Sequence, residues 1–148
     1  MTAAPSLRGG CHCGTLTLAL ATAQEPATIH PRACDCAFCL KHGAGWLSDA
    51  AGLLTIDVCD RARLSEYRQG SGSARFLLCR DCGVLVAVVH EGDGGLRGAV
   101  NARCLDAAAQ FDEPVTVSPQ RLSREDKIAR WDALWSPAEL RFHEARPG

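Results

Sequence analysis

The chain has 148 residues, of which 47% are hydrophobic, so it is long enough to bury a core without help from metals or disulfides. Its 16 basic and 17 acidic residues give a formal net charge of -1, which argues against strong nucleic-acid binding, because that binding depends on an excess of Lys and Arg. No apolar run approaches the roughly 20 residues that cross a bilayer, so no membrane partner is expected.

The nine cysteines need a chemical explanation. Residues 1–10 contain no apolar signal-peptide core, so we expect a cytoplasmic protein. Thiols stay reduced in that compartment, where clustered cysteines mark metal sites or catalysis more often than disulfides. An odd number of cysteines also suits a fully paired disulfide framework poorly.

Most of the predicted elements are strands. Residues 15–21 alternate between Leu and small or polar side chains, a pattern typical of a half-buried strand. The run 84–90 is rich in Val and predicts a central, well-buried strand. Further strands are expected at 53–58, 64–68, 75–78 and 96–101, with turns at 70–73 and 91–95.

One helix is predicted near the C-terminus, at about 122–136. Ser123 is suited to cap its N-terminus. Trp131 and Trp135 fall four residues apart on one face, which we interpret as core packing. Pro137 is expected to end the helix.

Two close cysteine pairs predict a four-thiolate zinc site. Cys11 and Cys13 are flanked by glycines, and Cys79 and Cys82 have the spacing of a zinc knuckle, with Gly83 free to adopt a positive φ. Two thiolates on one tetrahedral zinc ion lie about 3.8 Å apart, so the first segment must curl rather than stay extended. A closed site of four cysteines is structural.

A third cluster contains three cysteines within six residues, Cys34, Cys36 and Cys39. Three protein ligands with an open fourth position are typical of a catalytic zinc ion. His42 is a possible fourth ligand, although a polar turn residue is the plainer interpretation. The two remaining cysteines, Cys59 and Cys104, are interpreted as small buried hydrophobic residues.

These stretches resemble the glutathione-dependent formaldehyde-activating enzyme family, which shares its domain with centromere protein V. The matching stretches are Gly-Cys-His-Cys-Gly at 10–14, Cys-Asp-Cys-Ala-Phe-Cys at 34–39 and Arg-Phe-Leu-Leu-Cys-Arg-Asp-Cys-Gly at 75–83, within a similarity that covers about 7–115. The resemblance implies one zinc-binding domain over 1–148, with a mainly β fold. That fold is an antiparallel, Mss4-like β-tent of two or more small sheets around a zinc site, and here the C-terminal helix extends it.

The resemblance also implies a chemistry. It places a structural zinc ion on Cys11, Cys13, Cys79 and Cys82, and a second, labile zinc ion on Cys34, Cys36 and Cys39. The expected activity is that of a carbon–sulfur lyase acting on a small thiol such as glutathione and an aldehyde such as formaldehyde. Lys41 and Arg75 are candidates for holding a substrate carboxylate.

Two other functions stay open at this point, as does the oligomeric state. The first is a non-catalytic zinc module that binds a protein partner. The second is a thiol redox enzyme with Cys104 as its nucleophile. In the lyase hypothesis, three thiolates give the zinc site a net charge of -1, which makes the ion a poor Lewis acid for the carbonyl group. Bringing the reactants together must therefore supply much of any acceleration.

Overall fold

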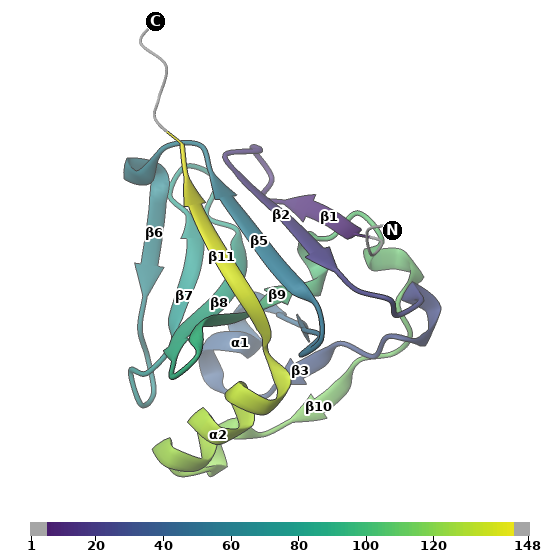
Figure 1. Ribbon diagram of the computed structural model, residues 1–148, viewed down its shortest axis with the longest axis vertical. Coiled ribbons are helices and arrows are strands. Elements are labelled where there is room, and N and C mark those ends of the chain that lie inside the picture. The colour runs from purple at the N-terminus through teal and green to yellow at the C-terminus, as the bar shows by residue number, and fades with distance from the viewer. Residues whose placement is uncertain (1–5, 144–148) are drawn as a thin grey trace, which may run out of the picture.

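A computed structural model describes residues 6–143, and their secondary structure is mainly β. The 11 strands form one hydrogen-bonded network that divides into two sheets (Figure 1). The first sheet contains, in spatial order, β1 (Ser6–Gly10), β2 (Leu16–Ala21), β5 (Leu53–Val58) and β11 (Ser136–Phe142). The second contains β6 (Leu64–Tyr67), β7 (Arg75–Cys79), β8 (Leu85–Gly92), β9 (Gly95–Asn101), β4 (Trp46–Leu47), β3 (Arg32–Cys34) and β10 (Val115–Val117). The expectation of a mainly β fold of joined sheets with a C-terminal helix is confirmed.

Strand β11 joins the two sheets. Ser136 and Pro137 pair antiparallel with β9, and residues 138–142 then pair parallel with β5. Strands β3 and β10 form a second parallel pair, so the arrangement is mixed rather than wholly antiparallel. Parallel neighbours need a long connection, and for β11 the helix α2 (Arg124–Leu134) lies on that connection.

The two α-helices are short and lie toward the lower end of the sheets in Figure 1. Besides α2 there is α1 (Ala37–His42), which the sequence analysis did not predict. The remaining helical segments are single 3-10 turns, at Pro26–Thr28, Arg61–Arg63, Ala102–Cys104, Ala108–Gln110 and Pro119–Arg121. None of the helices in residues 6–143 has the length and apolarity to cross a membrane.

The predicted helix is confirmed with shorter bounds. Ser123 caps it, and the Ser123 side chain accepts a hydrogen bond from the backbone amide of Asp126. The helix ends before Trp135, and Pro137 lies inside strand β11 instead of in a loop. Pro137 is tolerated there because it stands at the start of the strand, where the pairing changes from β9 to β5.

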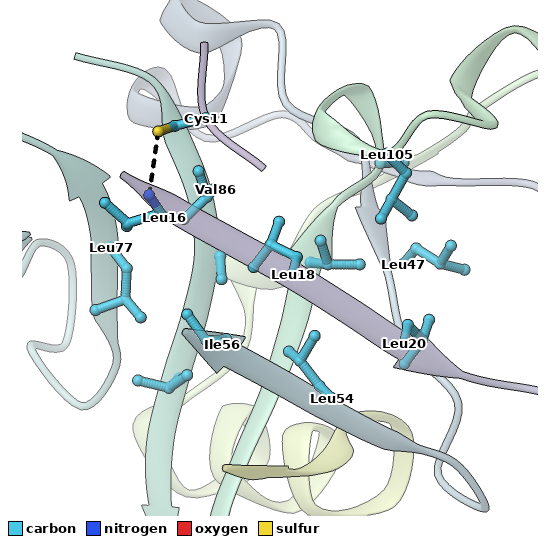
Figure 2. Packing of buried hydrophobic residues seen from close by; sticks show 14 of the residues in the cluster. Cys11, Leu16, Leu18, Leu20, Leu47, Leu54, Ile56, Leu77, Val86 and Leu105 are labelled. Atoms are coloured by element: carbon cyan, nitrogen blue, oxygen red, sulfur yellow. Dashed lines mark hydrogen bonds between the residues drawn. The ribbon is translucent and has the colours of Figure 1, made fainter. Parts of the chain in front are cut away.

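The main core lies between the two sheets and is built from alternating positions of β2 and β5. Leu16 of β2 and Ile56 of β5 lie beside Leu77 of β7 and Val86 of β8, whereas Leu18 and Leu20 lie toward Leu47 and Leu105 (Figure 2). Strand β8 is buried along residues 85–90, as the Val-rich run predicted. Its other face, with Val88, packs in a second cluster that contains Trp46, Phe76 and Trp135. This second cluster surrounds the three-cysteine segment.

Leu54→Ala should destabilise the fold by about 2–5 kcal/mol, because it leaves a cavity among fully buried side chains. Urea unfolding followed by circular dichroism measures the change. Leu53 is the matched control, since its side chain is 37% exposed and Leu53→Ala should change stability by roughly 0.5 kcal/mol or less. Equal effects of the two substitutions would contradict this assignment of the core.

Candidate metal centres

The four cysteines of the two predicted pairs meet at one point. Their sulfurs all lie within 4.8 Å of one another. The Sγ–Sγ distance is 3.7 Å from Cys11 to Cys13 and 3.5 Å from Cys13 to Cys79. These distances are close to the roughly 3.8 Å expected between two thiolate ligands of a tetrahedral zinc ion. The prediction that the two distant pairs share one site is therefore confirmed, and the donor set fits a metal ion.

Backbone amides point at these sulfurs. The amide of Leu16 donates to Cys11 Sγ over 3.3 Å, a bond drawn in Figure 2, and the amide of Cys82 donates to Cys79 Sγ over 3.5 Å. Gly83 has φ +77°, as the knuckle spacing predicted. These hydrogen bonds orient the thiols of each loop toward the shared centre, where they can act together as metal ligands.

The environments of these thiols differ. A hydrogen bond from the Thr15 hydroxyl, at 3.3 Å, is the largest of the effects that lower the pKa of Cys13 to about 6. Burial raises the pKa of Cys79 to about 12. A metal ion bound here therefore displaces a proton from at least Cys79 at neutral pH.

The second cluster is built around the start of α1. Cys34 ends β3, Cys36 is the N-cap of α1 and Cys39 lies in its first turn, and the three sulfurs lie within 4.8 Å of one another. Cys36 Sγ accepts the backbone amide of Cys39 over 3.4 Å. The indole Nε1 of Trp46 donates to Cys39 Sγ over 3.4 Å. The cluster is thus fixed by a helix cap and by a buried indole.

The Asp35 carboxylate ties this loop to the segment that follows β10. It accepts hydrogen bonds from Ser118 Oγ at 2.6 Å and from Gln120 Nε2. The Ser118 bond is the main reason that the pKa of Asp35 lies below its ordinary value. Residues 117–120 are therefore held against the three-cysteine loop.

Charge is shared unequally within the three-cysteine cluster. A hydrogen bond between Cys34 and Cys39 lowers the pKa of Cys34 to about 6 and raises the pKa of Cys39. At neutral pH, one thiolate is thus stabilised by a neighbour that keeps its proton.

The affinity of the three-cysteine cluster for a divalent metal should therefore rise with pH. Metal binding requires thiolates, so Cys39 must lose its proton, and that loss becomes easier as the proton concentration falls. We expect an increase of up to about tenfold per pH unit for each proton released. Competition with a chelator of known zinc affinity at several pH values measures it, and a flat profile would contradict the raised pKa of Cys39.

A cavity of about 110 Å³ opens beside the three-cysteine cluster, and none of the four other clustered cysteines lines it. Cys34, Cys36 and Cys39 form part of its wall. Aromatic side chains form much of the remainder, namely Trp46, Phe76, Trp131 and Trp135. Three basic residues also line it: Arg32, Lys127 and Arg130. The volume is enough for the reactive end of a small molecule rather than for a large ligand.

Other residues singled out in the sequence do not join either centre. His42 is exposed, and its ring packs against Phe38 at 4.7 Å instead of completing the three-cysteine set. Arg75 forms ion pairs with Glu66 and Glu91 outside the cavity. Lys41 is exposed and also lies outside the cavity lining.

The prediction for the two unclustered cysteines was half wrong. Cys59 is exposed, because it follows β5, where residues 54, 56 and 58 already occupy the buried positions. Cys104 is half-buried against the main core, with Sγ 3.3 Å from the carbonyl oxygen of Leu85. Burial raises the pKa of Cys104 to about 11.

Sequence analysis missed the basic side of the cavity. Lys127 and Arg130 are three residues apart on α2, next to Trp131, and this spacing already placed them near one another on the helix. The tryptophans of that helix were interpreted as core packing. Trp135 is indeed buried, whereas Trp131 is half-buried and lines the cavity.

Comparison with known proteins supports the fold. No family model matches the chain, and no curated protein matches it. A crystal structure from Rhodobacter sphaeroides, a structural-genomics target described only as a protein of that organism, is 27% identical in sequence. The alignment covers 75% of this chain and 100% of that chain, with a TM-score of 0.52. The chain is therefore similar to a solved structure whose description names no activity.

Proposed function

We propose that the protein is a zinc enzyme that joins a small thiol, such as glutathione, to an aldehyde, such as formaldehyde. This is the carbon–sulfur lyase chemistry of the family that the sequence resembles. The observation that carries the proposal is the position of Cys34, Cys36 and Cys39 in the wall of a cavity lined by aromatic and basic side chains. A purely structural metal centre needs no such cavity.

Two zinc ions have separate roles in this proposal. Cys11, Cys13, Cys79 and Cys82 would hold a structural ion with all four positions filled, and Cys34, Cys36 and Cys39 would hold a second ion with one position open. When bound, the second ion would lower the pKa of a substrate thiol and favour its thiolate. The nine free thiols suit the reducing cytoplasm that the sequence predicts.

The residues around the cavity account for the remaining needs of the reaction. The Trp46 indole fixes the position of Cys39, and aromatic side chains form much of the wall next to the cluster. The substrate sulfur bonds to the carbonyl carbon, its thiol proton passes to solvent, and the carbonyl oxygen takes a proton to become a hydroxyl group. Holding the sulfur and the carbonyl carbon together is the main contribution expected from the protein.

The two alternatives have less support. A non-catalytic zinc module that binds a protein partner would leave the cavity and its basic residues without a role. A redox enzyme with Cys104 as nucleophile would need an accessible thiolate, whereas burial raises the pKa of that thiol to about 11.

A rate assay with glutathione and formaldehyde tests the proposal. The zinc-loaded protein should form S-hydroxymethylglutathione faster than the uncatalysed reaction, and Cys36→Ser should lose that acceleration. Cys59→Ser is the control, because Cys59 belongs to neither cluster. Equal rates for the protein, the Cys36→Ser variant and the blank would overturn the proposal.

A further inference from the structure

The cavity next to the three-cysteine cluster holds three cations without carboxylate partners. Arg32, Lys127 and Arg130 line it, and none of the ion pairs found among residues 6–143 includes any of them. Neighbouring like charges repel, and the repulsion grows as aromatic walls replace water. An arrangement of this kind is stabilised when an anion enters.

Arg32 is held in place relative to helix α2. Its Nη2 donates to Ser48 Oγ over 2.7 Å, and the Ser48 hydroxyl donates in turn to the carbonyl oxygen of Leu134, the last residue of the helix, also over 2.7 Å. The planar guanidinium is therefore oriented before any ligand arrives, which suits recognition of a carboxylate.

The other two cations come from the cavity-facing side of α2. Arg32 and Arg130 both line the cavity. Burial, and after it the positive charge of Arg130, lowers the pKa of Arg32 to about 10. A Cβ atom added at Gly70 would lie 3.7 Å from Lys127 Nζ, so the ammonium group lies beside the 69–71 loop that also lines the cavity. The three basic residues thus line the same cavity as the three cysteines.

We propose that Arg32, Lys127 and Arg130 form a carboxylate-binding subsite that selects thiols bearing a negative charge. The inference rests on the proposed function, since it assigns the chemical class of the thiol that reaches Cys34, Cys36 and Cys39. Arg32 and Arg130 bind the carboxylate through charge-assisted hydrogen bonds, and Lys127 adds a third donor. Helix α2, which lies outside the family-like region, then sets the substrate preference of this chain.

A rival explanation is that the cations only offset the negative charge of the metal–thiolate cluster. The two explanations differ in what the Arg130→Gln variant loses. A charge-balancing arginine strengthens metal binding and treats all thiols alike. A substrate-binding arginine leaves the metal content unchanged and discriminates among thiols by their charge.

The test uses the zinc-loaded protein and three thiols of similar size. These are 3-mercaptopropionate, which is anionic, 2-mercaptoethanol, which is neutral, and cysteamine, which is cationic. Binding is followed by tryptophan fluorescence, because all three tryptophans of the chain, Trp46, Trp131 and Trp135, line the cavity. Cysteamine has the most acidic thiol of the three, so a preference for 3-mercaptopropionate cannot arise from thiol acidity.

We expect 3-mercaptopropionate to bind about tenfold more tightly than 2-mercaptoethanol, and cysteamine to bind most weakly. Arg130→Gln and Lys127→Gln should each remove most of the difference between the anionic and neutral thiols while two zinc ions per chain are kept. Arg124→Gln is the matched control on the same helix, because Arg124 bonds Ser73 and does not line the cavity. It should leave the preference intact.

Two results would overturn the subsite. One is equal affinity for the three thiols, and the other is loss of zinc in Arg130→Gln with the charge preference unchanged. A clear anionic preference in a protein that gives no acceleration with formaldehyde would support the subsite and overturn only the proposed reaction. The two ideas therefore fail separately.

Discussion

Replacing Cys79 with serine should leave the chain without a cooperatively folded state. Cys79 is 1% exposed and lies at the end of β7, where its sulfur is 3.5 Å from that of Cys13. A structural zinc site contributes about 10–16 kcal/mol, which equals or exceeds the roughly 5–15 kcal/mol of net stability of an ordinary domain. Serine is a poor zinc ligand and cannot restore the site.

Circular dichroism and a urea titration of Cys79→Ser measure this loss. The variant should show no sigmoidal transition, and added zinc should not restore one. Cys59→Ser is the control, because Cys59 is exposed and outside both clusters, and it should unfold within roughly 0.5 kcal/mol of the parent protein. A urea midpoint for Cys79→Ser that matches the parent would contradict a structural metal at this site.

Local sequence patterns were enough to predict most strands of this fold. Strand β5 was predicted at its observed bounds. In the structure its alternate residues from Leu54 to Val58 are buried, as expected for a strand with one face on the core. The Val-rich run of β8 was predicted to be buried, and in the structure both faces of this strand are covered by other residues. Each of these signals is contained within the strand itself.

Elements whose role depends on distant partners were not predicted. Strand β11 begins at Ser136 and Pro137, and Pro137 was interpreted only as the end of a helix. Nothing in the local sequence indicates that the chain then pairs with β5. Helix α1 is only six residues long, too short for the periodicity that indicated α2. For β11 the tertiary setting, rather than local preference, determined the structure.

The same distinction applies to the candidate site. Close spacing revealed all seven clustered cysteines, and folding brought them into the two predicted groups. The basic residues of the cavity were not found, because Arg32 is far from α2 in the sequence. The two are linked only in the folded protein, where Arg32 donates to Ser48 and Ser48 donates to the carbonyl oxygen of Leu134 at the end of the helix. Ligands with local spacing can therefore be read from sequence, whereas a subsite shared by distant elements requires the fold.

Cys36→Ser should separate the second centre from the stability of the fold. Cys36 is the N-cap of α1, where its sulfur accepts the amide of Cys39, and serine is among the best N-cap residues. The substitution therefore keeps the start of the helix while removing a metal ligand. We expect stability within about 1 kcal/mol of the parent protein and a decrease from two zinc ions per chain to one.

Metal analysis of the purified protein, paired with a urea titration, measures both quantities on one sample. Cys59→Ser should keep both ions, which controls for the loss of any thiol. If Cys36→Ser keeps two ions, the three-cysteine cluster is not the second site. If Cys36→Ser unfolds, the three-cysteine cluster is a structural centre, and its position beside the cavity no longer supports a catalytic role. The predicted combination, a folded chain with one ion, is expected only when the four-cysteine site holds the fold together and the three-cysteine site does not.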